Sequence, residues 1–390
     1  MRTIMSNKQE YTNHAQYSSS QAEINLDQFK DNLKAIAGIC SAHVKLMAVV
    51  KANAYGHGAE RIARTALKAG ADCLAVANIS EGIYLRSTGV QSMILILGVL
   101  VHKWIPAIFD NKLTPSIATL EDAILINEYG KSIHHACKVH FRVESGNGNG
   151  EAKDDLIVKL IRDINQMEYL QLEGLYTHLP SAYADDLTLA KNDIRIFDEL
   201  VNQLQQQGIF IPLIHAASSP AILNLPEAHY NMVRCGILMY GLPATSNQPH
   251  IAVKPIMKIR SEIVAYKQIE PGHTYGYANK FVTDKLIHTA VIPFGYGDGN
   301  FMFYLQQGEV LIRGRHIAII GQIYMDHFLV DVSNIHTELG DEVIILGEQG
   351  SQEIAAVDIA EQASIGRLNS DFICLLSGRV PRIYIEENLE

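Results

Sequence analysis

The sequence predicts an α/β barrel followed by a mainly β domain, and three observations lead to this fold class. Eight short apolar segments alternate with amphipathic segments between about residues 40 and 242. After Gly241-Leu242-Pro243 the pattern changes, and turn residues separate many short strand-like runs. A chain of 390 residues is too long for one small core and long enough for a large barrel with an additional domain.

The eight apolar segments are rich in β-branched and aliphatic residues and nearly continuous, as in parallel strands buried on both faces. They are residues 45–50, 73–76, 93–97, 115–118, 139–143, 172–177, 212–215 and 231–234. Helical patterns lie between them, at residues 59–68 and at 192–205. The second pattern gathers apolar residues on one face, namely Ile194, Ile196, Phe197, Leu200 and Leu204. Strands alternating with helices predict a (β/α)8 barrel of the TIM type. The alternative, a doubly wound sheet, lacks a G-x-G-x-x-G after its first strand.

Residues 244–249 are polar and without period, which is typical of a linker. We therefore expect a barrel domain over residues 1–248 and a β domain over 249–390. Glycine and aspartate separate the strand-like runs of the second domain. These runs are residues 257–266, 288–293, 309–312, 316–320, 328–332 and 342–346.

Composition excludes several functional classes. The formal net charge of -10 argues against a nucleic-acid partner and against docking on an anionic membrane. The longest apolar run, residues 93–101, is too short to span a bilayer. Five scattered cysteines without a C-x-x-C pair, and a polar segment 1–20 without an apolar signal region, predict a cytoplasmic protein with reduced thiols. The histidines show no metal-ligand spacing, so we expect no metal.

Lys51 directly follows the first apolar run, in the segment V-V-K-A-N-A-Y-G-H-G. Active sites of (β/α)8 barrels lie at the C-terminal ends of the strands. A desolvated amine there has a lowered pKa, and its neutral form is the nucleophile that a Schiff-base lysine needs. The position alone favours the other interpretation, a lysine whose ammonium reaches solvent past the strand end.

The segment 49–58 resembles the pyridoxal 5′-phosphate (PLP) attachment segment of alanine racemases. The similarity extends from about residue 22 to 384 through several motifs in the same order. These are Y-T-H at 176–178, residues 215–219, M-V-R-C-G at 232–236, Y-G at 240–241, T-Y-G at 274–276, G-Y-G-D-G at 295–299, M-D at 325–326 and R-V-P-R at 379–382. The resemblance implies a PLP-dependent isomerase that interconverts L- and D-alanine, with Lys51 carrying the cofactor. Supply of D-alanine as a cell-wall precursor and catabolism both remain open as its role.

The resemblance also implies which residues hold the cofactor. Arg234 would face the pyridine nitrogen, and because a guanidinium does not donate its proton readily, the ring would remain unprotonated. His178 would support the ring, with His215 nearby. The phosphate would be held by the Ser219 hydroxyl, the backbone N–H groups of Gly236 and Ile237, and Tyr55.

Racemisation removes a proton from one face of Cα and returns it on the other, which two bases achieve without a swinging group. The resemblance assigns these bases to Lys51 and to Tyr275 of the partner subunit, so it implies a homodimer with shared active sites. The Met325 backbone N–H would bind the substrate carboxylate. Tyr296 and Asp326 would line the access route.

Two positions depart from the family pattern. The loop after the fifth strand commonly reads K-x-D-T-G-M-G-R, whereas residues 142–149 read R-V-E-S-G-N-G-N. Our hypothesis is that Arg142 supplies, on the substrate-binding side, the positive charge that the family has where this chain has Asn149. Near the C-terminus, the family tyrosine that narrows the pocket aligns with Ser370. A smaller side chain there alters selectivity by about 1–3 kcal/mol.

Three other functions remain as alternatives. A serine or broad-specificity amino-acid racemase would share the scaffold, and relative rates on alanine, serine, lysine and arginine distinguish it. A non-catalytic PLP-homeostasis protein would lack a C-terminal β domain. A decarboxylase would need a Gly-rich phosphate loop and a cysteine motif, which residues 146–150 and Cys374 fit poorly.

Overall fold

A computed structural model describes residues 16–144, 154–244, 251–272, 274–275, 281–299, 308–356, 358–359 and 373–386. The chain forms two compact units. The first, here called the barrel unit, comprises residues 29–54 and 58–253. The second, here called the β unit, comprises residues 1–28, 55–57 and 254–390.

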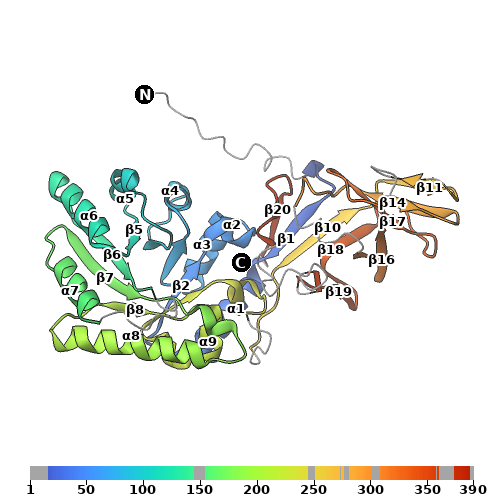
Figure 1. Ribbon diagram of the computed structural model, residues 1–390. Helices are drawn as coiled ribbons and strands as arrows, with labels where there is room; N and C mark the ends of the chain where they lie inside the picture. The colour runs from blue at the N-terminus through green and yellow to red at the C-terminus, as the bar shows by residue number, and fades with distance from the viewer. Residues whose placement is uncertain are drawn as a thin grey trace. The chain divides into compact units, whose positions relative to one another are not determined.

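Eight parallel strands form the centre of the barrel unit (Figure 1). Their order is β8-β7-β6-β5-β4-β3-β2-β9, and a parallel bridge between Ser218 and Arg234 brings the ends of the sheet together. The strands are β2 (Lys45–Val49), β3 (Cys73–Val76), β4 (Ile94–Ile96), β5 (Thr114–Ile117), β6 (Cys137–Arg142), β7 (Leu170–Tyr176), β8 (Leu213–His215) and β9 (Met232–Cys235). Each overlaps one of the eight apolar runs, so the predicted barrel is confirmed.

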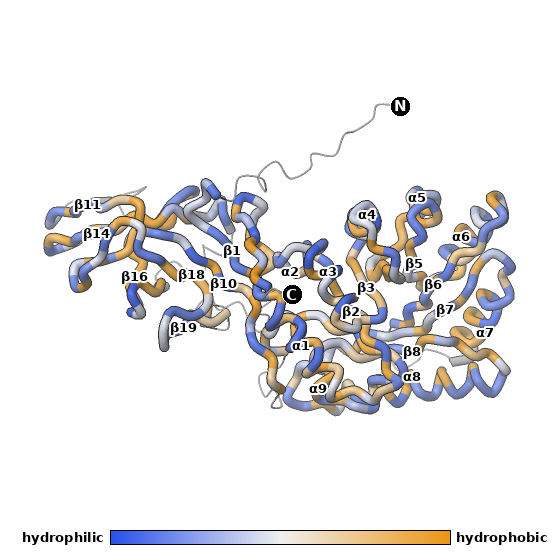
Figure 2. The backbone as a smooth tube through the Cα atoms, turned by 180° about the vertical axis from the view of Figure 1, so that it is seen from behind, coloured by the Kyte–Doolittle hydropathy of each residue, from blue (hydrophilic) through white to orange (hydrophobic). Residues whose placement is uncertain are grey.

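Helices cover the outside of these strands (Figure 1). They are α1 (Leu26–Ile39), α3 (Ala59–Lys68), α4 (Ile79–Ser87), α5 (Ile105–Asp110), α6 (Leu120–Ile133), α7 (Asp154–Asn165), α8 (Thr188–Gln206) and α9 (Ser219–Asn224), with 3-10 turns η2 (His102–Trp104), η3 (Pro180–Tyr183), η4 (Pro226–His229) and η5 (Ile237–Tyr240). Apolar and polar stretches alternate along α6, α7 and α8 (Figure 2). In α8 the predicted apolar face is buried except for Ile196, which is half-buried.

The β unit is built around a ten-stranded sheet with the path β11-β14-β17-β16-β15-β18-β10-β1-β20, and β19 pairs with β18. Its strands are β1 (Gln21–Asn25), β10 (Met257–Glu262), β11 (Ala265–Ile269), β14 (Ile287–Ile292), β15 (Glu309–Ile312), β16 (Arg315–Ile320), β17 (Phe328–Asp331), β18 (Glu342–Gln349), β19 (Gln352–Ile354) and β20 (Arg382–Ile385). Strands β12 (Thr274–Tyr275) and β13 (Phe281–Val282) form a separate pair. The mainly β prediction is confirmed, although the expected run 257–266 divides into β10 and β11 because the chain changes partner from β18 to β14.

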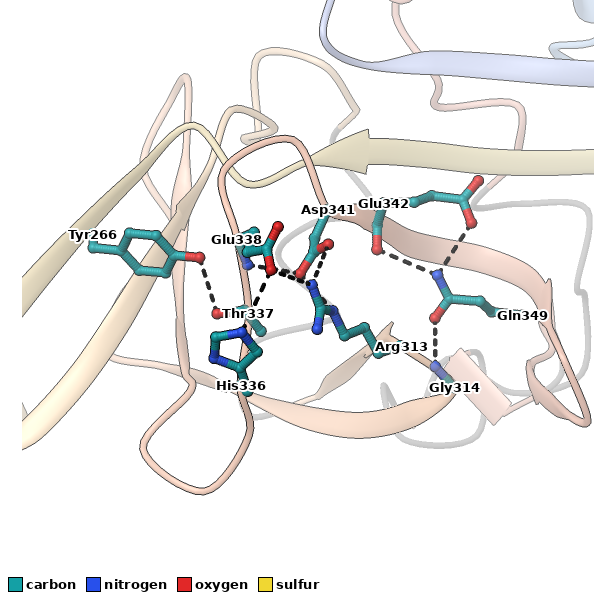
Figure 3. A network of polar contacts seen from close by, with 9 residues as sticks. All are labelled: Tyr266, Arg313, Gly314, His336, Thr337, Glu338, Asp341, Glu342 and Gln349. Atoms are coloured by element: carbon teal, nitrogen blue, oxygen red, sulfur yellow. Dashed lines mark hydrogen bonds and ion pairs between the residues drawn. The ribbon is translucent and has the colours of Figure 1, made fainter.

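A two-residue turn joins β15 to β16 (Figure 3). Arg313 and Gly314 have φ values of 49° and 70°, as a type I′ turn requires at both positions. The Arg313 side chain donates to both Asp341 carboxylate oxygens, at 2.8 and 3.0 Å, and this hydrogen-bonded pair lowers the pKa of Asp341. The Gly314 N–H donates to the Gln349 side chain at 2.9 Å. Contacts to the β18 region therefore hold a turn in which only one residue is a glycine.

Gly174 allows two strands of the barrel to approach around a buried ring. It lies opposite His140 in the β6–β7 pairing. A Cβ on Gly174 would lie 2.3 Å from His140 Nδ1 and 2.5 Å from two carbons of the same ring. Because the ring is fully buried and cannot move into solvent, this position excludes any side chain.

We predict that Gly174→Ala lowers the free energy of unfolding by about 1–3 kcal/mol, the usual cost of overpacking a close-packed interior. Urea denaturation followed by circular dichroism measures it. The matched control is Gly38→Ala in α1, where a Cβ meets nothing within 4 Å, so helix propensity should leave stability unchanged or raised. Equal effects of the two substitutions would contradict the argument.

Candidate active site

Polar side chains gather where the parallel strands of the barrel unit end. Lys51 follows β2, Arg142 is the last residue of β6, and His178 follows β7. Ser219 opens α9 after β8, and Arg234 lies on β9. Because the C-terminal ends of parallel strands lie at one end of a barrel, these side chains share its catalytic end.

Lys51 begins a left-handed turn, which is rare in proteins. Ala52, Asn53, Ala54 and Tyr55 have φ values of 52°, 54°, 54° and 52°. None is a glycine, and the left-handed conformation costs an L-residue roughly 1–2 kcal/mol. Strain of this kind persists only where the surroundings enforce it, which is common at functional sites.

Glu81, at the start of α4, is one residue that enforces the turn. Its carboxylate accepts from the Ala52 N–H at 2.8 Å and from the Ala77 N–H at 2.7 Å. The Asn53 side chain accepts from the Ala59 N–H at 2.9 Å and so ties the turn to the start of α3. The sequence analysis missed Glu81, because the spacing Asn78-x-x-Glu81 is also that of an ordinary helix cap.

The Arg234 guanidinium is held by four hydrogen bonds inside the barrel. Nη1 donates to His215 Nδ1 at 2.9 Å and to the His215 carbonyl at 3.2 Å. Nη2 donates to the carbonyls of Thr177 and Ala216 at 2.9 and 3.0 Å. Burial lowers the pKa of Arg234 to about 10, so it stays charged at pH 7. Within the described structure these bonds leave its Nε–H as the donor for a ligand.

Two neutral histidines extend inward from Arg234. His215 Nε2 lies 2.9 Å from His140 Nδ1, and both rings are fully buried. Burial, followed by the charge of Arg234, lowers the pKa of His140 to about 3 and that of His215 well below its usual value. Tyr176 stacks on His215 with ring centroids 4.8 Å apart and donates its hydroxyl to Ser116 at 2.8 Å.

Ser219 and Gly236, which the resemblance assigns to a phosphate site, are joined by a hydrogen bond. The Ser219 hydroxyl accepts from the N–H of Gly236 at 3.0 Å and from that of Leu238 at 3.3 Å. Ile237 opens η5 next to them. The hydroxyl and the two N–H groups thus form a small, buried polar cluster after β9.

Arg142 and His178 lie in the same electrostatic environment. Burial, then the charges of Arg234, Lys51 and Arg142, lower the pKa of His178 to about 4. The residue as a whole is nevertheless exposed, so solvent moderates this effect. Arg142 also forms an ion pair with Glu144, with Nη2 2.9 Å from Oε1. Its charge therefore belongs to the cluster around Lys51, partly balanced by one carboxylate.

The remaining expected site residues lie in the β unit or outside the described residues. The N–H of Tyr296 donates to the Tyr324 carbonyl at 3.0 Å, next to the bond from Gly297 to the Met325 carbonyl at 2.9 Å. Arg379 donates to the Asp326 carboxylate at 2.8 Å. Tyr55 ends the left-handed turn and groups with the β unit, and Tyr275 lies on β12, opposite Phe281. The Tyr275 side chain, Asn149 and Ser370 lie outside the described residues.

No group of three or more His, Cys, Asp or Glu residues in the described ranges is arranged to hold a metal ion. In the same ranges no helix has the length and apolar character needed to cross a membrane.

The buried His140 predicts a pH dependence of stability. Its pKa is about 3 in the folded protein, and its ordinary value is 6.5. Between these values the unfolded chain binds a proton that the folded chain does not, so stability is full above pH 6.5 and falls as the pH drops towards 3. The slope for one such group is at most about 1.4 kcal/mol per pH unit.

Urea denaturation between pH 7.5 and 5 measures that slope. His140→Gln should reduce it. The control is His43→Gln, an exposed histidine of the same unit, which should leave the slope unchanged. Identical slopes in the wild type and His140→Gln would contradict the pKa assignment.

Two family profiles match this chain, one before and one after the segment around residue 250. The profile of the alanine racemase N-terminal domain matches residues 24–244, and that of the C-terminal domain matches residues 256–384. An alanine racemase from Methanococcus maripaludis is 34% identical over 93% of this chain and 98% of its own length. One from Halothermothrix orenii is 35% identical over 93% of this chain and 96% of its own length.

A solved structure of an alanine racemase is also similar to this chain. The alanine racemase of Clostridium difficile in complex with cycloserine superposes with a TM-score of 0.88 at 34% identity, covering 95% of this chain and 96% of that one. Both domains and nearly the full length of the relatives are therefore matched. The chain is an enzyme of the alanine racemase family.

Proposed function

We propose that this enzyme interconverts L- and D-alanine with PLP carried by Lys51, and that it supplies D-alanine. The observation that carries the proposal is the grouping of Lys51 with a buried, charged Arg234 whose Nε–H is left to a ligand. A fixed cation at the end of a barrel, beside a lysine on a strained turn, is suited to an electron-poor aromatic cofactor and an amino-acid substrate.

The donor set fits the chemistry of PLP. The phosphate would be held by the Ser219 hydroxyl, the N–H groups of Gly236 and Ile237, and Tyr55. Ser219 already lies within hydrogen-bond distance of the Gly236 N–H, so donor and acceptor atoms are gathered there. The pyridine nitrogen would accept from Arg234, and the exposed His178 would lie against the ring.

Bound PLP would withdraw electrons from the substrate Cα and so acidify its proton. Lys51 would take up or return that proton on one face, and Tyr275 of the partner subunit would do so on the other. Arg234 keeps its own proton at pH 7 because its pKa stays near 10. It would therefore give the ring nitrogen a hydrogen bond without a proton, which favours prompt return of the proton to Cα over side reactions.

The β unit would complete the site in a homodimer. The Met325 N–H would bind the substrate carboxylate, while Tyr296 and Asp326 would line the access route. Arg379 donates a hydrogen bond to the Asp326 carboxylate, which supports a role for that carboxylate in lining the access route. The large β unit also separates this chain from a non-catalytic PLP-homeostasis protein, which needs no such unit.

A broader substrate range is the second candidate. Ser370 aligns with a bulkier residue of the family. The loss of one side-chain contact in a substrate pocket changes discrimination between substrates by roughly 1–3 kcal/mol, about 10–200-fold. Serine would be the first additional substrate to test, because its side chain exceeds that of alanine by one hydroxyl. We place the enzyme in the cytoplasm because all five cysteines are free thiols.

Mixing two inactive variants tests the proposed function. Lys51→Ala should lose the visible absorbance band of lysine-bound PLP and at least about 10²–10⁴-fold of kcat, and Tyr275→Phe should lose a similar share of kcat. Co-refolding the two variants should restore activity, since mixed dimers contain one site with both bases. A coupled D-amino-acid assay with L-alanine, L-serine, L-lysine and L-arginine measures the rates.

Activity of each variant alone at the wild-type level would refute the assigned bases. No recovery on mixing, with dimers present, would refute the sharing of sites between subunits.

We also propose that Arg142 supplies the positive charge that relatives draw from the position of Asn149. Its influence on the pKa of His178 supports this placement. Arg142→Ala should lower kcat/KM about tenfold, the usual loss for one charged hydrogen bond. Arg142→Lys combined with Asn149→Arg installs the common family pair and should restore the rate. Glu144→Gln, which removes only the ion-pair partner, is the control and should retain activity. Unchanged kcat/KM in Arg142→Ala would contradict the exchange.

A further inference from the structure

A row of polar groups runs through the barrel unit away from the proposed cofactor, from three buried side chains to the surface. It begins at Arg234 on β9 and passes through His215 on β8 and His140 on β6. It reaches Glu173 on β7, whose other oxygen bonds to Lys138 at 2.5 Å. Arg234 and Lys138 lie at opposite ends of the row. Neither His140 nor Glu173 has a part in the reaction proposed above.

With a guanidinium at one end and a carboxylate at the other, the hydrogen bonds in this row run in one direction. A guanidinium has no acceptor, so His215 Nδ1 must accept from Arg234. His215 is neutral because burial holds its pKa low, and its single proton is therefore on Nε2. That N–H donates to His140 Nδ1 at 2.9 Å. His140 is neutral for the same reason, so its own proton is on Nε2.

The last step of the row faces a carboxylate. His140 Nε2 and Glu173 Oε2 lie 3.9 Å apart. Both atoms are buried, and within the described structure neither has a hydrogen-bond partner. A buried N–H and a buried carboxylate oxygen without partners are each costly, and each supplies what the other lacks. The His140 ring lies directly over Gly174, next to Glu173, where a Cβ would be 2.3 Å from Nδ1.

We propose that Glu173 is a positioning residue for the reaction: as the terminal acceptor, it fixes the tautomers of His140 and His215 and thereby the orientation of Arg234. The proposal rests on the proposed function in that Arg234 is taken to face the cofactor ring. Without the carboxylate, only the Arg234 N–H would oppose a proton on Nδ1 of His215, and the Nε2–H of His140 would face no acceptor. A proton on Nδ1 of His215 would meet the Arg234 N–H head-on and displace the guanidinium.

Glu173→Gln tests this proposal because both carboxylate oxygens accept hydrogen bonds, whereas the glutamine amide has one oxygen that accepts and one NH₂ group that donates. The Lys138 ammonium selects the amide oxygen, which leaves the NH₂ group towards His140. Nε2 of His140 must then accept, so the protons of both histidines should move to Nδ1. The matched control is Glu168→Gln, an exposed carboxylate of the same unit shortly before β7.

The first readout needs no cofactor. Long-range ¹H–¹⁵N NMR spectra of the ¹⁵N-histidine-labelled full chain report which ring nitrogen carries the proton, with His140→Gln and His215→Gln for assignment. We expect Nε2–H for both rings in the wild type and in Glu168→Gln, and loss of Nε2–H from His140 in Glu173→Gln. Nδ1–H on either ring in the wild type overturns the proposal, even if the variant fails to fold. Unchanged tautomers in a folded Glu173→Gln overturn it equally.

The second readout follows Arg234 at the cofactor. After reconstitution with PLP, the pH midpoint of the visible band should shift in Glu173→Gln in the same direction as in Arg234→Lys, and should not shift in Glu168→Gln. The kcat for alanine should fall about tenfold, with little change in KM, because Glu173 touches no substrate. A wild-type midpoint in Glu173→Gln with moved tautomers would overturn the link to Arg234. Absence of a PLP band in the wild type would refute the proposed function and leave the tautomer result standing.

Discussion

The burial of one guanidinium charge constrains much of the barrel interior. A charge moved out of water is stable only when its donors are satisfied, and Arg234 satisfies Nη1 and Nη2 with three carbonyls and an imidazole. The carbonyls come from the ends of β7 and β8, which must therefore stop where they do. The imidazole must be neutral, which only a buried histidine ensures at physiological pH.

Much of the barrel could be predicted from the sequence because buried parallel strands leave a simple pattern. Each of the eight strands overlaps a predicted apolar run, and β3 has the predicted bounds. The short strand β1 was not predicted, because the alternation of polar and apolar residues in Q-A-E-I-N covers only five residues ahead of the barrel. The split between β10 and β11 was missed for a related reason. Ile263 and Val264 join them without a glycine or proline, so nothing local marks the change of partner.

The site was predicted from a resemblance, and the physical details behind it were not. Residues 52–55 contain no glycine before Gly56, so no propensity rule predicts four left-handed residues there. His140 and Glu173 occupy strand positions where a lone polar residue usually means a solvated edge. A signal existed in β6, where Lys138, His140 and Arg142 alternate with apolar residues. That alternation marks polar groups on one face of a strand that the apolar-run analysis treated as uniform.

The place of β1 in the sheet of the β unit has a consequence for how the chain folds. β1 pairs with β10 on one side and with β20 on the other, and both partners follow the barrel in the sequence. β1 is therefore synthesised before the barrel and can pair only after the barrel has been made. The barrel is thus an insertion within a discontinuous unit. Contacts of such long sequence separation form slowly. The barrel can be complete on the ribosome before β20, the last of the described strands, has emerged. During that interval β1 has an unpaired edge that a chaperone could cover.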